Sequence, residues 1–209
     1  MTRSPDEART ITALLALAAG LMILPTAGSA AGEYKATCYD GEAFQVVARD
    51  RYGVVGMDIA YRPRKPGTDR GGCDWSIGRH DVWVSENRGD RSEDANYVVG
   101  VKEPFILMDV GTAPAPDRGF VIYDMRSRKI VLTAGVSQDV AIEADRAVLW
   151  IRSGKPPART CSNQKEIDRE IGAPRAGSAP AIGVAVKHTF DFRRGSLVKT
   201  EEAKCYVES

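Results

Sequence analysis

Short apolar runs separated by turn-forming residues dominate the chain between Phe105 and Ile151. Each run is followed by proline, glycine or charged residues, and runs of this length bounded by such residues are typical of β-strands. The predicted strands in this stretch are residues 105–110, 120–125, 130–132, 140–142 and 147–151. We expect them to form a β-meander that supplies the largest part of the core.

Further β-pattern lies on both sides of the meander. Within 54–61, apolar residues at alternate positions predict one buried face, with Asp58 on the opposite, polar face. The other predicted strands are residues 34–38, 43–48, 82–84, 97–101, 181–187, 189–193 and 205–207.

One short helix is expected over residues 163–171. Asn163 is placed to cap its first turn, with Glu166 reaching back three residues later. Ile167 and Ile171 lie four apart and share a face. This apolar face is narrow, so we expect the helix to lie on a sheet.

These elements predict an all-β fold, a single-domain antiparallel sandwich or barrel over residues 31–209. A small propeller-like arrangement is the lesser alternative, because residues 121–131 resemble the outer strands of one blade. Nothing at a spacing of about 40 residues repeats that segment, as a propeller requires.

Residues 1–30 have the layout of a secretory signal peptide. An apolar run from Ile11 to Leu24 precedes Pro25, and small residues follow up to a cleavage site after Ala30 or Ala31. No later apolar run approaches the 18 or so residues of a membrane-spanning helix. We therefore expect a periplasmic or secreted protein with no transmembrane anchoring after signal removal.

The net charge is +1, and removing residues 1–30 leaves it unchanged because two basic and two acidic residues go together. So small a charge argues against nucleic acid as a partner. Two local basic clusters, residues 62–65 and 126–129, fall in predicted turns, where solvated charge is the ordinary interpretation.

Four cysteines in an exported chain predict two disulfides, formed from Cys38, Cys73, Cys161 and Cys205. Three pairings are possible. Sequential pairing keeps each bridge on one side of the meander, whereas a Cys38–Cys205 bridge ties the ends together. A metal site is not expected, since there is no Cys-x-x-Cys spacing and the chain has only two histidines.

The loop between the first two strands of the meander is the predicted binding site. Its two prolines, Pro114 and Pro116, stiffen the chain and hold neighbouring side chains still. The candidate binding residues in and around it are Asp109, Thr112, Asp117, Arg118 and Asp124. Asp109 and Asp124 are also a carboxylate pair that could serve glycoside hydrolysis. The alternative is that these two aspartates cap turns by accepting hydrogen bonds from backbone amides.

Other catalytic and cofactor signals are weak. The nearest match to a serine-hydrolase Gly-x-Ser-x-Gly motif, residues 135–139, lacks its final glycine. His80 and His188 are the two candidate general bases, and no glycine-rich nucleotide-binding motif occurs, so no cofactor is expected. Trp75, Trp83 and Trp150 could line a groove, although two of them lie in apolar strand runs where core packing is expected.

Residues 34–38 (YKATC) and 40–46 (DGEAFQV) resemble the opening strands of the exported C-type lysozyme inhibitors, which are small β-barrels. The inhibitory Ser-Gly-x-x-Tyr motif of that family is not present at Ser153-Gly154, so no functional residue is carried over.

Together these features predict an exported, non-catalytic binding or interaction protein of a bacterial-type cell envelope, with an unknown protein or glycan ligand. The alternatives are a small secreted hydrolase that uses a carboxylate or histidine, and an inhibitor of a cell-wall-degrading enzyme.

Overall fold

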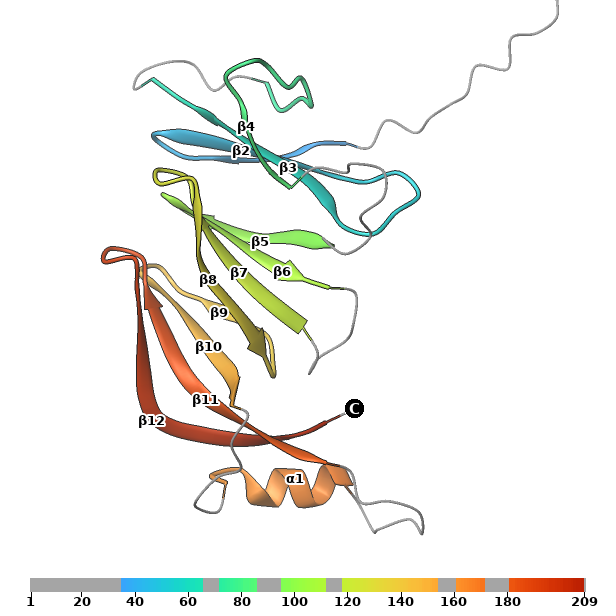
Figure 1. Cartoon of the computed structure of the whole chain (residues 1–209), viewed down its shortest axis with the longest axis vertical. Helices are drawn as coiled ribbons and strands as arrows, with labels where there is room; N and C mark the ends of the chain where they lie inside the picture. The colour runs from blue at the N-terminus through green and yellow to red at the C-terminus, as the bar shows by residue number, and fades with distance from the viewer. Residues whose placement is uncertain are drawn as a thin grey trace, which may run out of the picture. The chain divides into compact units, whose positions relative to one another are not determined.

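The computed structural model describes residues 35–65, 72–85, 95–111, 118–153, 161–171 and 181–208, and the predicted signal peptide lies outside them. The fold is all-β, built from two antiparallel sheets (Figure 1). The first sheet has the order β1-β2-β3-β4, with β1 Thr37–Asp40, β2 Phe44–Asp50, β3 Met57–Pro63 and β4 Val82–Ser85.

The second sheet contains the predicted meander and has the order β12-β11-β10-β8-β7-β6-β5, with β9 beside β10. Its strands are β5 Asn96–Lys102, β6 Phe105–Val110, β7 Arg118–Asp124, β8 Lys129–Val136, β9 Ala141–Ile142, β10 Arg146–Ser153, β11 Ile182–Asp191 and β12 Ser196–Val207. Among the described residues neither sheet closes on itself, so the sandwich is the predicted alternative that the chain adopts.

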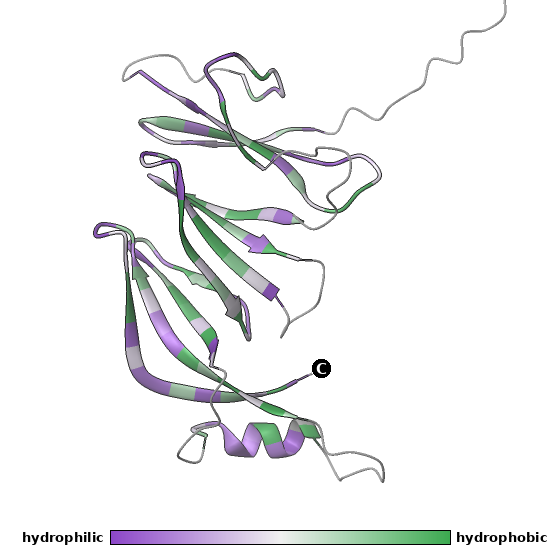
Figure 2. Cartoon of the chain, in the orientation of Figure 1, coloured by the Kyte–Doolittle hydropathy of each residue, from purple (hydrophilic) through white to green (hydrophobic). Residues whose placement is uncertain are grey.

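Strands β6 and β7 are buried on both faces. One face, with Ile106 and Met108, packs against the first sheet in a cluster that includes Val46 and Tyr61. The other face, with Leu107, packs in a second cluster with residues of β10 and β11. Burial on both sides explains why β7 is hydrophobic along most of its length in Figure 2 rather than alternating.

The second sheet folds over itself between β8 and β10. These two strands share a single register pair, Val136 with Ile151, whereas β10 and β11 pair over eight residues. Phe105 of β6 contacts Phe190 of β11, with ring centroids 5.2 Å apart, although three strands separate β6 from β11 in the sheet order. The sandwich therefore has three layers: the first sheet, β5 to β8, and β9 to β12.

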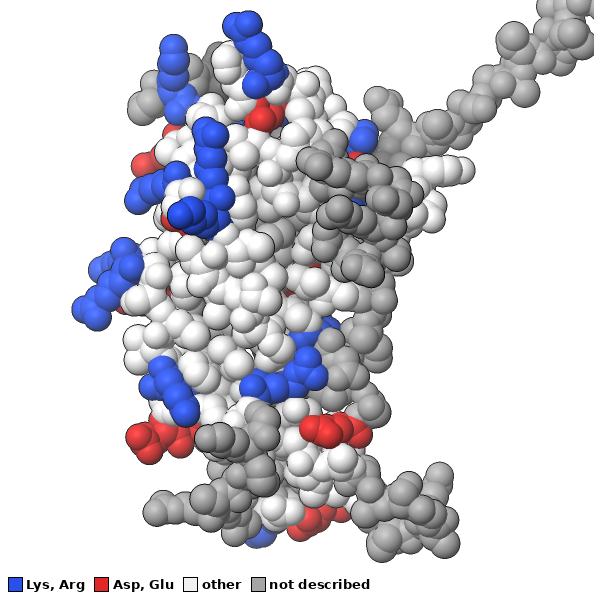
Figure 3. Space-filling view, viewed as in Figure 1, with Lys and Arg blue, Asp and Glu red and all other residues white. Residues whose placement is uncertain are grey.

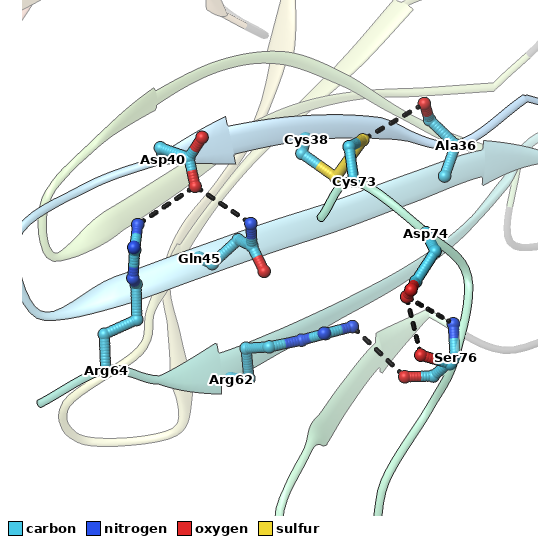
Figure 4. The surroundings of a disulfide bond; sticks show 9 residues. All are labelled: Ala36, Cys38, Asp40, Gln45, Arg62, Arg64, Cys73, Asp74 and Ser76. Carbon is cyan, nitrogen blue, oxygen red and sulfur yellow. Dashed lines mark hydrogen bonds and ion pairs between the residues drawn. A yellow bond between two sulfur atoms is a disulfide. The ribbon is translucent and has the colours of Figure 1, made fainter. Parts of the chain in front are cut away.

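The outer face of the first sheet is covered by a segment that we call the strap, residues 72–81. Its Cys73 forms a disulfide with Cys38 of β1, and the carbonyl of Ser76 accepts a hydrogen bond from Arg62 at 3.2 Å (Figure 4). On this face Val47 and Ala60 are both 1% exposed. The strap thus gives a four-stranded sheet a second buried face.

The alternating pattern predicts that Asp58 faces solvent, but in the structure it does not. It is buried on the strap side of β3 and pairs with Arg51 at 3.1 Å and with Arg49 at 3.3 Å. Arg51 also donates to Ser85 at 2.7 Å. The period-2 pattern over 54–61 identified a strand, but β3 begins only at Met57, with Val54 and Val55 exposed before it, and the pattern did not indicate the cover over the polar face.

Helix α1 (Gln164–Ile171) lies on β12, as expected, with Ile167 buried against Val184 and Cys205. The predicted capping role of the Asn163 side chain is wrong. Its Oδ1 accepts from Cys205 N and its Nδ2 donates to Cys205 O, both at 2.9 Å. Asn163 therefore pairs with the outer edge of β12 as a neighbouring strand would.

The C-terminal hairpin is longer than predicted. Strand β11 continues through His188, with a register shift between Val186 and His188, and β12 spans twelve residues instead of only 205–207. The first half of β12 is mostly exposed, and Leu197 and Val198 are its two apolar residues. Cys161 and Cys205 form the second disulfide, so the sequential pairing is correct and both bridges lie outside the meander.

Candidate functional site

Asp109 and Arg118, two of the predicted binding residues, lie next to each other. Asp109 is near the end of β6, and Arg118 begins the neighbouring strand β7. The Arg118 guanidinium pairs with the Asp109 carboxylate and also with Asp139, the latter at 2.6 Å. Thr112 and Asp117 lie outside the described residues. A binding role for this rim stays a prediction.

Asp124 is not part of the same rim. In the β6–β7 register Asp109 faces Phe120 while Asp124 faces Phe105, so the aspartates lie at opposite ends of the strand pair. At about 3.3 Å per residue, four residues separate them by roughly 13 Å. Asp124 accepts hydrogen bonds from the amides of Arg126 and Ser127 at 2.9 and 3.4 Å. Asp124 therefore caps a turn, which is the alternative to a catalytic role.

The two histidines are far apart in the topology. His80 lies in the strap and its Nε2 is 2.9 Å from Arg79 Nε, while His188 lies on β11 with Nδ1 2.9 Å from the Val186 carbonyl. Within the part of the chain that the structure describes, neither ring bonds a serine hydroxyl or a carboxylate. The geometry does not assemble a nucleophile and base around either one.

The tryptophans divide between the core and the strap. Trp150 is buried, as expected for an apolar strand run. Trp83 is 36% exposed on edge strand β4, so the expected core position is wrong for it. Its ring meets Trp75 of the strap edge-on at 5.7 Å, and the Arg49 guanidinium lies 4.4 Å from the Trp75 ring centre. These aromatic contacts hold the strap on the sheet.

An open groove of about 460 Å³ lies where four hairpin turns meet, and we call it the turn groove. Its walls come from the turns β5–β6, β7–β8, β9–β10 and β11–β12. It is lined by Lys102, Glu103, Pro104, Arg126, Ala144, Asp145, Phe192 and Arg193. A groove of this volume is in the range that small-molecule sites occupy.

The turns are tied to one another by backbone hydrogen bonds. Met125 N donates to Pro104 O, joining β7–β8 to β5–β6, and Phe192 N donates to Asp145 O, joining β11–β12 to β9–β10, both at 2.9 Å. Glu103 reaches the first sheet, where its carboxylate accepts from the amides of Ala43 and Phe44 at 3.0 and 2.8 Å. The groove walls are therefore fixed to both sheets.

Two of the turns share a local sequence and conformation. Asp124-Met125-Arg126 and Asp191-Phe192-Arg193 each place a capping aspartate, a buried apolar residue and an exposed arginine in succession. Asp191 accepts from the amides of Arg193 and Arg194, as Asp124 does from its own turn. The fourth residue after each aspartate has positive φ, 58° at Arg128 and 62° at Gly195.

Matching turns thus bring Arg126 and Arg193 to the same groove. In Figure 3 lysine and arginine side chains are spread along the left of the view, from the first sheet down past the turns, with some acidic side chains among them. The amides of Arg194 and Arg193 lower the pKa of Asp191, so its carboxylate remains a charged cap at neutral pH.

Sequence reasoning missed the turn groove, although part of its signal was present. The basic cluster 126–129 lies in a predicted turn, where solvated charge is the ordinary interpretation. The recurrence of Asp, an apolar residue and Arg at the ends of two strands was the available signal. What the sequence did not indicate is that these two hairpins lie together, because this depends on the fold between β8 and β10.

No group of three or more histidine, cysteine, aspartate or glutamate side chains suited to hold a metal ion occurs within the described residues. None of the helices in that part of the chain is long and apolar enough to cross a membrane. Comparison with known proteins found no matching family model, no similar curated protein and no similar solved structure.

Proposed function

We propose that this chain is an exported binding protein of the cell envelope, without catalytic activity, and that its ligand occupies the turn groove. The observation that carries the proposal is the convergence of four cross-tied turns on one groove. Recognition by turns held on a rigid β-scaffold is a common arrangement, because the sheet fixes the backbone while the turn residues vary. Two disulfides are compatible with an oxidising compartment.

The contacts of the candidate catalytic groups support binding over hydrolysis. Asp109 is paired with Arg118, and Asp124 is occupied by two backbone amides. A glycosidase needs two carboxyl groups roughly 5 to 10 Å apart, one of them available as an acid, and these two are further apart than that.

Retention of a ligand from envelope extract tests the proposal. The mature protein is immobilised, incubated with extract, washed, and its retained compounds are identified by mass spectrometry. The matched variant is Ala144→Trp, which places a large side chain at an exposed position in the groove wall. We expect the wild-type protein to retain a defined compound that the variant does not, and neither protein to cleave a panel of glycans and peptides.

Turnover of any panel member by the wild-type protein, lost in Asp109→Asn, would replace this proposal with the hydrolase alternative. Equal retention by wild type and Ala144→Trp would place the ligand elsewhere. Circular dichroism of both proteins checks that the variant is folded.

A further inference from the structure

The turn groove combines three cations with a fixed backbone. Lys102, Arg126 and Arg193 all line it, and within the described residues none of the three side chains forms an ion pair with a carboxylate. An unpaired arginine presents several donors in a planar fork that suits phosphate and carboxylate oxygens.

Two acidic residues also line the groove. The Glu103 carboxylate is turned toward the first sheet, where it accepts two backbone hydrogen bonds. Asp145 is 57% exposed and lies 4.0 Å from Arg146. The balance of charge that faces a bound molecule is therefore positive, although the whole chain has a net charge of only +1.

The backbone that carries each of the two arginines is fixed. Each arginine lies two residues after the aspartate that caps its turn. That aspartate accepts two amide hydrogen bonds and so holds the backbone of the turn. The apolar residue before each arginine is buried, Met125 at 2% and Phe192 at 7% exposed, which anchors the turn to the core. A fixed backbone reduces the conformational entropy that is lost when a ligand binds.

We propose that the turn groove binds a small anion carrying at least two negative charges, of the phosphate type, held between Arg126 and Arg193 with Lys102 as a third contact. This inference rests on the proposed function, since it names the ligand class for the same groove. Phosphate in an envelope comes either from a soluble molecule or from a lipid headgroup, and both sources offer the same oxygens to the two arginines.

Inorganic pyrophosphate is the probe for the soluble source. Titration calorimetry in about 50 mM salt should show binding that weakens as salt is raised, because contacts between opposite charges are screened. Arg126→Gln and Arg193→Gln should each weaken binding on the order of tenfold, and by similar factors, because a charge-assisted hydrogen bond contributes about 1.4 kcal/mol or more. Lys165→Gln with Arg169→Gln removes two charges from α1 and should leave binding unchanged.

Asp191→Ala separates a built site from diffuse positive charge. The variant makes the chain more positive but removes the carboxylate that holds the Arg193 amide. If the groove depends on a positioned arginine, pyrophosphate binds more weakly to this variant; if charge alone attracts the anion, it binds more tightly. Tighter binding would overturn the proposal.

Vesicles of phosphatidylglycerol, compared with phosphatidylcholine, provide the lipid arm. Cosedimentation only with the anionic vesicles, lost in the Arg126→Gln and Arg193→Gln double variant, assigns the phosphate to a headgroup. Pyrophosphate binding without cosedimentation assigns it to a soluble molecule. Absence of both, or retention of either by the double variant, contradicts the anion proposal. Loss of the envelope ligand in Ala144→Trp would then still support the groove as a binding site.

Discussion

Tyr61 shows how one polar atom joins the two sheets. It lies on β3 with its ring buried in the shared core, and its hydroxyl donates to the carbonyl of Met125 at 2.9 Å in the β7–β8 turn. Burial, followed by the neighbouring Tyr123, raises the pKa of Tyr61 to about 12. The folded protein therefore favours the protonated form of the Tyr61 hydroxyl.

Replacing Tyr61 by phenylalanine should therefore have an effect that depends on pH. At pH 7 the variant loses one hydrogen bond, which costs about 1 kcal/mol of unfolding free energy. The folded pKa is raised, so the contribution of the tyrosine is complete below pH 10 and is lost as the pH rises through 12. Urea denaturation at pH 7, 9 and 11 should show the gap between wild type and variant narrowing at pH 11.

The exposed Tyr52, 78% accessible, gives the control, because Tyr52→Phe should track the wild type at each pH. A gap between wild type and Tyr61→Phe that stays constant to pH 11 would contradict the assignment of the raised pKa to Tyr61.

Single residues were the hardest features to predict from the sequence. Alternation places Asp58 on the polar face of its strand. That face is buried beneath the strap, a segment more than ten residues further along the chain. Trp83 belongs to an apolar run but lies on an edge strand. In both cases the sequence pattern indicates which side a residue points to, while its exposure depends on what another segment covers.

At the scale of elements, strand positions in the meander were predictable because apolar runs and turn residues are local signals. The β7–β8 turn, with its four residues between two apolar runs, formed as expected. The length of β12 was not predictable, since its first half has no alternating pattern, is mostly exposed and pairs with β11. Helix α1 was predicted from its own residues, but the contact that docks it was not.

Asn163 provides that contact and makes it testable. Asn163→Ala leaves the N–H and C=O of Cys205 without their side-chain partner, which should lower the unfolding free energy by about 2 kcal/mol. Asn163→Asp keeps the size but turns the donor that faces Cys205 O into a charged acceptor, so it should be worse than alanine. Denaturant unfolding of the oxidised protein measures both.

Gln164 is the matched control. Its side chain bonds only the exposed Asp168 one turn away, so Gln164→Ala should cost less than about 0.5 kcal/mol. If Asn163→Ala costs as little as this control, the Asn163 side chain does not dock the helix.

At the scale of the whole molecule, the three layers follow from β6 and β7 having no solvent-facing side. Neighbouring residues of a strand point to opposite faces. In a two-layer sandwich one of two neighbouring side chains faces solvent, so truncating it costs little stability. Here Ile106 faces the first sheet and Leu107 faces β10 and β11, and both are 0% exposed.

Ile106→Ala and Leu107→Ala should consequently destabilise the protein by similar amounts, about 3 kcal/mol each. Val131→Ala, on the exposed part of β8, should change the unfolding free energy by no more than about 0.5 kcal/mol. Denaturant midpoints of the three variants measure these losses of stability. A large effect for one neighbour and a small one for the other would mean that only two layers are packed.

The continuous apolar runs made an all-β core predictable, but they did not reveal that the core is double. A run such as 105–108 is compatible with any strand buried on both sides, and the partners for its second face come from β10 and β11, far along the chain. The turn groove depends on the same long-range fold.

The placement of the two disulfides bears on how the chain matures. If the chain is exported N-terminus first, as proposed, Cys38 meets Cys73 before Cys161 has appeared, and Cys161 then has only Cys205 left to join. Oxidation in order of appearance therefore produces the native bonds directly. Such a chain reaches its cross-linked state without a step that reshuffles mispaired thiols.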